Sequence, residues 1–197
     1  MLKYSKHKYS ERPFLSIITR VYKRPVGLSA NKASIVSLTD KDVEQIFITD
    51  HVGVGLLEAN RSFSHNEVKV LIEGEYVFLL DADDFIVNKN MVQELKQIHA
   101  ERNPDVIFFR MIIKNNMNNN YYPTDKECWG LRPVIARIGG SCFVVKKDIY
   151  MKFIHHFALP RCGDFAYIDK VFNSGASCYW HNVLFAETGK VSRGKPE

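Results

Sequence analysis

Short apolar runs separated by polar turns shape the first half of the chain. The most informative is Tyr76 to Leu80, which is continuous rather than alternating. A run of this kind is typical of a strand buried on both faces of a parallel sheet. Similar runs and amphipathic stretches before it predict strands over 14–19 and 43–50 and helices over about 31–37 and 64–72. The alternation of strands and helices predicts an α/β fold with a Rossmann-like sheet.

The second half continues the pattern with longer polar segments. Helical spacing and further apolar runs predict helices at 91–98, 148–154 and 165–172, strands at 105–113, 139–145 and 177–180, and an Asn-rich hairpin tip at 115–120. No repeat or linker divides the chain, so we expect one domain whose mostly parallel central sheet is flanked by helices. Within it we expect a loosely ordered basic tail (1–12), a nucleotide-binding half (13–100) and a half that forms a lid or binds a second substrate (101–197).

Composition narrows the class of protein. The chain has 197 residues, of which 46% are hydrophobic and 25% charged, as in ordinary globular domains. Its net charge of +5 suits a phosphate-bearing ligand, but no Lys/Arg block interleaved with aromatics indicates a nucleic-acid partner. Four scattered cysteines disfavour a zinc ribbon. Without an apolar leader or spanning segment, the sequence predicts a cytoplasmic protein whose only membrane contact is peripheral, at the inner face.

Three carboxylates end the Tyr76–Leu80 run: Asp81, Asp83 and Asp84. Acids so close together repel one another, and a divalent cation is the usual means of holding them. Ligands of open α/β sheets bind at the carboxyl ends of the strands. We therefore expect a metal-assisted site here.

Two earlier strands also end in polar groups. The first leads into a loop with Thr19, Arg20, Tyr22 and Arg24, where cations suit a diphosphate and the ring suits a base, although a solvated loop is the simpler interpretation. The second ends in Asp50 and is followed by glycines, which let a backbone approach a ligand closely.

Together these pieces resemble the GT-A glycosyltransferases of family 2. The segment Gly74-Glu75-Tyr76, the apolar run and Asp81-Ala82-Asp83-Asp84 are similar to that family's signature. The resemblance covers residues 13–100 well and the second half in outline.

The resemblance implies a role for each matching residue on the donor side. Thr19, Tyr22 and Arg24 would line the base and diphosphate pocket, with Arg20 and Ala82 beside them. Asp50 would accept a hydrogen bond from the base or ribose, and Asp81 would face the ribose or the metal's waters. Asp83 would bind Mn²⁺ or Mg²⁺, and Asp84 would support the turn.

In the second half the resemblance implies a general base at Asp164, which could also serve as a helix N-cap, with Asp169 in reserve. His181 would complete the metal site, although a lone His is more often an ordinary structural residue.

The expected function is that of a metal-dependent inverting glycosyltransferase of polysaccharide biosynthesis. It would move a sugar from a nucleoside-diphosphate sugar, best a UDP-sugar, to a hydroxyl of a glycan or glycolipid acceptor. A non-catalytic module of the same fold that binds nucleotide or glycan, and a sugar-phosphate nucleotidyltransferase, are the alternatives. The oligomeric state is left open.

Overall fold

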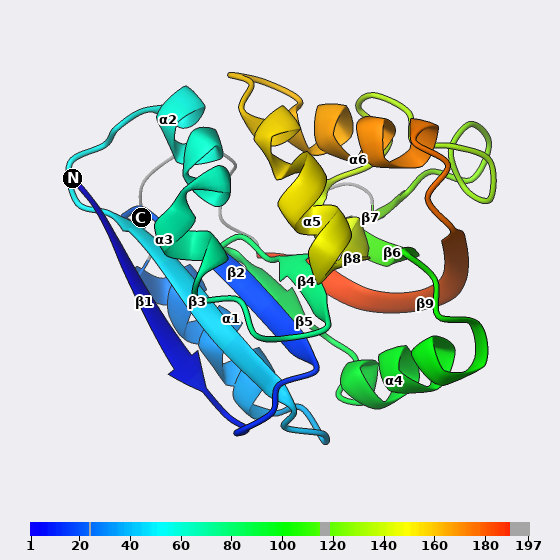
Figure 1. Ribbon diagram of the computed structural model, residues 1–197, viewed down its shortest axis with the longest axis horizontal. Helices are drawn as coiled ribbons and strands as arrows, with labels where there is room; N and C mark the ends of the chain where they lie inside the picture. Colours follow the sequence, from blue (N-terminus) through cyan, green and yellow to red (C-terminus); the bar gives the residue numbers. More distant parts are fainter. Residues whose placement is uncertain (24, 115–118, 190–197) are drawn as a thin grey trace.

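The computed structural model describes residues 1–23, 25–114 and 119–189, and a nine-stranded mixed sheet forms its centre (Figure 1). The strands lie in the order β1-β3-β2-β4-β8-β6-β9-β5, and β7 pairs with β6. Their bounds are β1 Leu2–Lys8, β2 Leu15–Val21, β3 Val43–Asp50, β4 Tyr76–Leu79, β5 Asp84–Ile86, β6 Val106–Lys114, β7 Asn119–Tyr122, β8 Phe143–Lys146 and β9 Cys178–Thr188.

The prediction of a mostly parallel sheet is wrong. β2 is parallel to β3 and β4, and β6 is parallel to β9, but the other pairings are antiparallel. β8 lies between β4 and β6 and runs against both. A continuous apolar run shows that a strand is buried, but it does not encode the direction of that strand.

The first residues are not a loose tail. Strand β1 pairs antiparallel with β3 from Glu44 to Asp50 and forms one edge of the sheet. Lys6 reaches inward to the buried carboxylate of Glu44 at 3.2 Å, and Lys6 and Lys8 both pair with Glu73. These two hydrogen-bonded lysines lower the pKa of Glu73 to about 2. The basic composition that indicated a tail therefore attaches an edge strand to the domain.

The helices lie where apolar spacing places them, with one addition. Their bounds are α1 Pro25–Val36, α2 Leu56–Arg61, α3 Asn66–Lys69, α4 Met91–Arg102, α5 Lys147–Phe153 and α6 Gly163–Asn173, with 3-10 turns η1 Ser62–Ser64, η2 Gly140–Cys142 and η3 Ile154–Phe157. Helix α2 was not predicted, and the η1 turn follows directly from its end. The Asn-rich hairpin tip falls largely at 115–118, outside the described residues.

Helices α2, α3, α5 and α6 lie in front of the sheet in this view, whereas α1 lies behind β1, β3 and β2, and α4 lies at the lower right (Figure 1). η1 packs against η3, so the two groups of helices meet. Beneath them β4 is buried along its whole length. The carboxyl ends of β2 and β4 therefore face the start of α6. No helix in the described ranges is long and apolar enough to cross a membrane.

Candidate functional site

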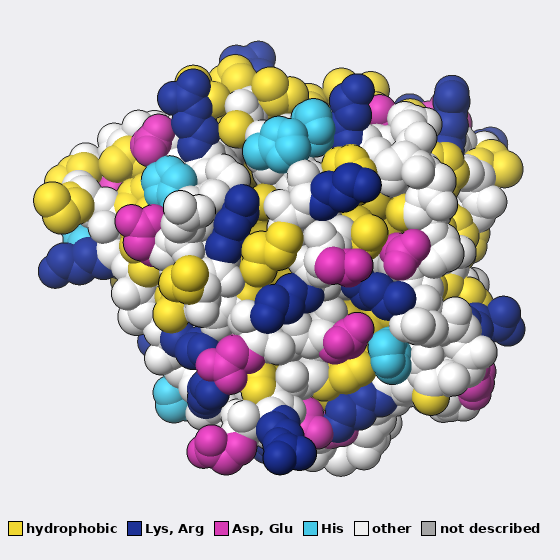
Figure 2. Space-filling view, viewed as in Figure 1, with side chains coloured by type: hydrophobic (Ala, Val, Ile, Leu, Met, Phe, Trp, Pro, Cys, Tyr) yellow, Lys and Arg dark blue, Asp and Glu magenta, His cyan; other side chains and the backbone are white. Residues whose placement is uncertain are grey.

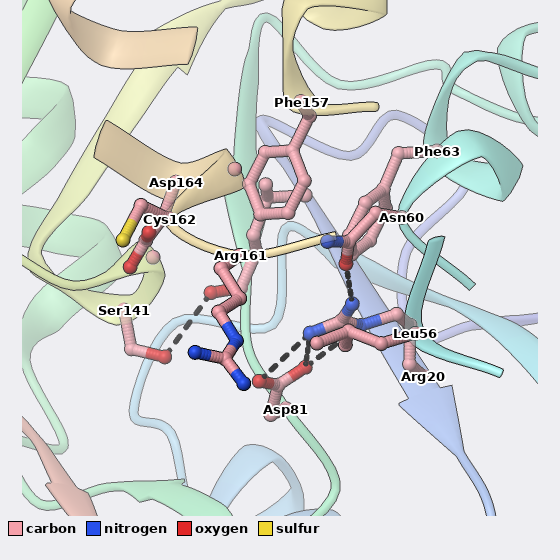
Figure 3. A pocket seen from close by; sticks show the side chains of 13 residues that line it. Arg20, Leu56, Asn60, Phe63, Asp81, Ser141, Phe157, Arg161, Cys162 and Asp164 are labelled. Atoms are coloured by element: carbon pink, nitrogen blue, oxygen red, sulfur yellow. Dashed lines mark hydrogen bonds and ion pairs between the residues drawn. The ribbon is translucent and has the colours of Figure 1, made fainter. Parts of the chain in front are cut away.

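A cavity of about 170 Å³ opens where these segments meet (Figure 3). Its walls come from β2 and the α2–η1 segment, from the end of β4 and the η2 turn, and from the η3–α6 connection. The lining residues are Arg20, Leu56, Asn60, Phe63, Leu79, Asp81, Gly140, Ser141, Phe157, Arg161, Cys162, Gly163 and Asp164. The structure thus brings together three of the predicted residues, Arg20, Asp81 and Asp164, from both halves of the chain.

Arg20 and Asp81 form an ion pair on one wall of this pocket. Both guanidinium edge nitrogens, Nε and Nη2, donate to Asp81 Oδ1 at 3.0 and 2.8 Å, and Nη2 also reaches Oδ2 at 3.0 Å. A further nitrogen of Arg20 donates to the side-chain oxygen of Asn60, and the guanidinium lies 4.7 Å from the centre of the Phe63 ring. Arg20, expected to bind a diphosphate, instead holds the carboxylate of Asp81 in place.

Asp164 lies on the opposite wall, in the first turn of α6. The chain enters this helix through Cys162 in the left-handed region (φ 54°) and then Gly163, where a Cβ would collide with the carbonyl oxygen of Phe157. Asp164 Oδ1 accepts the backbone N–H of Phe165 at 2.9 Å. The N-cap position itself belongs to Cys162, so Asp164 is not the cap.

Burial raises the pKa of the Asp164 carboxyl above its usual value, and the negative charge of Asp81 adds to the shift. The backbone N–H of Phe165 and the positive charge of Arg20 act in the opposite direction without cancelling it. A carboxylate with a raised pKa accepts a proton more readily, which is what a general base requires.

Arg161 extends into the same cavity from the residues just before α6, and its guanidinium lies on the Asp81 side (Figure 3). Among the described residues, its side chain has no hydrogen-bond or ion-pair partner. Sequence reasoning did not single out this residue. It also missed Asn60 and Phe63, although Leu56, Asn60 and Phe63 follow the i, i+4, i+7 spacing that places side chains on one helix face.

The acidic turn after β4 is built against α1. Asn31 donates to the carbonyl oxygens of Asp81 and Asp84 at 3.1 and 2.8 Å. A Cβ at Gly27 would lie 3.0 Å from the carbonyl oxygen of Ala82, so the helix start and the turn touch. Ala82 is buried, and the carboxylate of Asp84 accepts the Ser141 hydroxyl at 2.7 Å, in keeping with the supporting role expected of Asp84.

Asp83 lies in this turn but outside the cavity lining. Its carbonyl oxygen accepts the backbone N–H of Gly189 at 2.5 Å. In the part of the chain that the structure describes, no group of three His, Cys, Asp or Glu is placed to hold a metal ion.

The expected base-binding residues gather elsewhere. Tyr22 packs against Gly53, where a Cβ would lie 2.6 Å from the tyrosine oxygen. The carboxylate of Asp50 accepts the backbone N–H groups of Val52, Gly53 and Val54 at 2.8–2.9 Å. Partial burial opposes ionisation of Asp50, but these hydrogen bonds bring its pKa below the usual value. Tyr22 and Asp50 therefore both contact the loop that contains Gly53. Tyr22 directly follows β2, which forms one wall of the pocket.

Two expected residues have other roles, and one lies outside the described residues. The Thr19 side chain is fully buried and accepts a hydrogen bond from Gln45 at 2.9 Å, so it does not line the pocket. His181 Nε2 lies 2.8 Å from Oε2 of Glu94 on α4. Along β9, His181 is seven residues from Thr188, which pairs with Asp84. Seven residues of extended strand span up to about 23 Å, and His181 is placed at α4 rather than at the acidic turn. Arg24 lies outside the described residues.

No protein-family model and no curated protein matches the sequence. Solved structures do match its fold. TarS 1-349 of S. aureus in complex with UDP-GlcNAc superposes with a TM-score of 0.64 at 13% identity, over 92% of this chain and 60% of that one. Its complex with UDP gives 0.66 at 14% identity, over 89% and 60%. A protein of STIV gives 0.56 at 13% identity, over 85% and 81%.

The chain therefore has a glycosyltransferase-like α/β fold, shared with a protein whose crystal structures hold UDP and UDP-GlcNAc. It spans 60% of the length of that TarS fragment.

Proposed function

We propose that this chain binds a nucleoside-diphosphate sugar, best a UDP-sugar, and transfers the sugar to a hydroxyl of a glycan or glycolipid with inversion. The observation that carries the proposal is the pocket in which Asp81, from the nucleotide-binding half, faces Asp164, from the second half. The shared fold with a UDP-GlcNAc-binding protein supports the donor class.

In this proposal the nucleotide lies over the loops that follow β2 and β3. Tyr22 offers an exposed ring on which the base can stack. Asp50 already holds the loop around Gly53 in shape, and its lowered pKa keeps it an acceptor for a base or ribose donor. The sugar then extends past Asp81 into the cavity.

Asp164 acts as the general base. The acceptor oxygen attacks the anomeric carbon on the face opposite the diphosphate, and the bond from that carbon to the diphosphate oxygen breaks. The hydroxyl proton passes to the Asp164 carboxylate, and the products are the new glycoside and the free nucleoside diphosphate. The raised pKa of Asp164 suits this transfer, because base strength rises with the pKa of the conjugate acid.

A divalent cation would bind at the acidic turn together with a donor. Mg²⁺ and Mn²⁺ are often held by one or two carboxylates plus substrate phosphates, so a protein cluster of three ligands is unnecessary. Asp83 would supply one carboxylate, with Asp81 two residues away in the same turn. A bound cation would neutralise charge on the leaving diphosphate. His181 is not part of this proposal, since it pairs with Glu94.

Titration calorimetry with UDP and UDP-GlcNAc, with Mn²⁺ and with chelator, tests the donor site. We expect binding that Mn²⁺ strengthens and that Asp83→Ala reduces by about tenfold or more. Asp148→Ala is the matched control, because that exposed carboxylate lies at the start of α5 and outside the pocket. No affinity for any nucleoside diphosphate would end the proposal.

A non-catalytic module of the same fold is the second candidate, and one observation favours it. Asp81 is already engaged by Arg20, and Thr19 is buried, so part of the expected donor set is committed to structure. Release of UDP from a bound UDP-sugar, with or without a glycan acceptor, separates the two candidates. Release of pyrophosphate instead would indicate a nucleotidyltransferase.

A further inference from the structure

Arg161 is a cation that the described fold does not use. Its side chain lines the cavity, is exposed, and has no hydrogen-bond or ion-pair partner among the described residues. The other arginine of the pocket, Arg20, is held by Asp81, Asn60 and the Phe63 ring. Folding gains little from Arg161, and a long charged side chain aimed into a cavity is available to a ligand.

The charges of the pocket leave Arg161 without compensation. Arg20 and Asp81 neutralise one another through three contacts of 2.8–3.0 Å. Asp164 is the remaining acid of the lining, and burial disfavours its charged form. Among the described residues, no hydrogen bond or ion pair joins Arg161 to either acid.

The position of Arg161 points to the sugar rather than the diphosphate. Tyr22, Asp50 and Asp83, the residues proposed for the nucleotide and the metal, are absent from the cavity lining. Arg161 instead comes from the segment that carries Asp164, the proposed base. A group bound by Arg161 would thus lie between Asp81 and Asp164, where the proposed reaction brings sugar and acceptor together.

We propose that Arg161 binds the carboxylate of an acidic sugar of the uronic-acid type, seated in the cavity between Asp81 and Asp164. This inference rests on the proposed function and narrows its substrate class. The planar guanidinium can donate two parallel N–H bonds to a carboxylate, which gives both affinity and orientation. A neutral sugar would leave the charge of Arg161 unmatched.

A carboxylate fits this cavity better than a phosphate monoester. Asp81 and Asp164 lie on the walls, so added negative charge is opposed by both. A carboxylate brings one negative charge, whereas a phosphate monoester carries about 1.5 to 2 at neutral pH. A carboxylate close to Asp164 would also raise its pKa further, and so make it a stronger base.

The test measures binding of matched acidic and neutral sugars by calorimetry in the presence of Mn²⁺. The donor arm compares UDP-glucuronic acid with UDP-glucose. The acceptor arm compares methyl β-D-glucuronide with methyl β-D-glucoside, with UDP and without it. We expect the acidic sugar to bind about tenfold more tightly in one arm, because a charged hydrogen-bonded pair stabilises by more than a neutral one.

Arg161→Gln should abolish that preference without unfolding the protein, and Arg161→Lys should retain part of it. Arg12→Gln is the matched control, since Arg12 is also exposed, and its side chain has no partner among the described residues. Equal binding of both sugars in both arms overturns the inference, as does a preference that survives Arg161→Gln. Tighter binding of methyl β-D-glucoside 6-phosphate than of the glucuronide overturns the choice of carboxylate.

The two proposals fail separately. If UDP and UDP-glucose bind as tightly as UDP-glucuronic acid, and the glucoside binds as tightly as the glucuronide, the donor site stands and the role of Arg161 is removed. Absence of any UDP binding removes the proposed function, and the glucuronide arm without UDP then decides the role of Arg161 alone.

Discussion

The two walls of the pocket hold their charges differently. On the β2–β4 wall, Arg20 and Asp81 form a bidentate pair that Asn60 and Phe63 brace. On the α6 wall, Arg161 has no partner among the described residues and Asp164 accepts one backbone N–H. On the first wall the charges of Arg20 and Asp81 are therefore balanced within the protein. The second holds Arg161 and Asp164, for which no protein ion pair is seen among the described residues, and our proposal places the chemistry there.

The largest expected effect is a loss of turnover when Asp164 on the α6 wall is changed. Asp164→Asn keeps the shape of the side chain but removes the proton acceptor, so transfer should fall by about 10²- to 10⁴-fold. Donor affinity should stay the same, because the proposed function places Asp164 on the acceptor side. UDP release and calorimetry on the same preparation check both statements.

Asp169→Asn is the control for this change, because Asp169 lies on the same helix but outside the cavity lining. Full activity in Asp164→Asn would remove Asp164 as the base. Loss of activity in Asp169→Asn alone would transfer that role to Asp169.

A second way to disturb the α6 wall is to move the backbone beneath it. Gly163→Ala would place a Cβ against the carbonyl oxygen and ring of Phe157, both fixed by the core. We expect a loss of about 2–3 kcal/mol in the free energy of unfolding. Gly139→Ala meets only ordinary contacts of 3.8–3.9 Å and should change stability by less than about 0.5 kcal/mol. Chemical denaturation compares them, and equal losses would contradict the close approach at Gly163.

How far the sequence predicts this pocket depends on the range of the interactions. β4 and its acids could be predicted, because a continuous apolar run followed by carboxylates is a local signal. Strand β1 could not be predicted in this way. The ion pair that holds its inward face against the sheet joins Lys6 and Glu44, which are far apart in the chain. The antiparallel insertion of β8 has the same origin, since only packing sets the direction of a strand.

Individual site residues show the same limit. Neighbouring residues of a strand point to opposite faces, so Thr19 and Arg20 could not both have lined the pocket, and this local rule was available. The position of His181 could not be predicted from the sequence. It follows from the pairing of β9 with β6 and from a shift in that pairing beside Phe109. Arg161 became notable only when the structure showed that nothing pairs with it among the described residues.

The β2–β4 wall offers a smaller test, on stability. Arg20→Gln removes the bidentate pair and the contact with Phe63, and we expect a loss of about 1 kcal/mol, since the Asp81 side chain is 47% exposed and solvent screens its charge. Arg61→Gln breaks a single 3.7 Å contact with Glu58 and should cost less than about 0.5 kcal/mol. Thermal unfolding of both variants ranks them. An equal effect would mean that the Arg20 pair does not brace the wall.

The smallest expected effect is a pH dependence of stability that belongs to Asp164. Its pKa in the folded protein lies above the unfolded value of about 3.8, so the folded state binds more protons in the window between the two. The contribution of this carboxyl to stability is therefore present at acid pH and is lost as the pH rises through that window. Asp164→Asn has no such group, so it should gain stability relative to the wild type as the pH rises from about 3 to 7. Thermal unfolding midpoints across this range measure the difference, with Asp169→Asn beside it as the reference. A difference that stays constant with pH, or one that falls, would mean that burial does not raise the pKa of the Asp164 carboxyl, and the contrast between the two walls would then be lost.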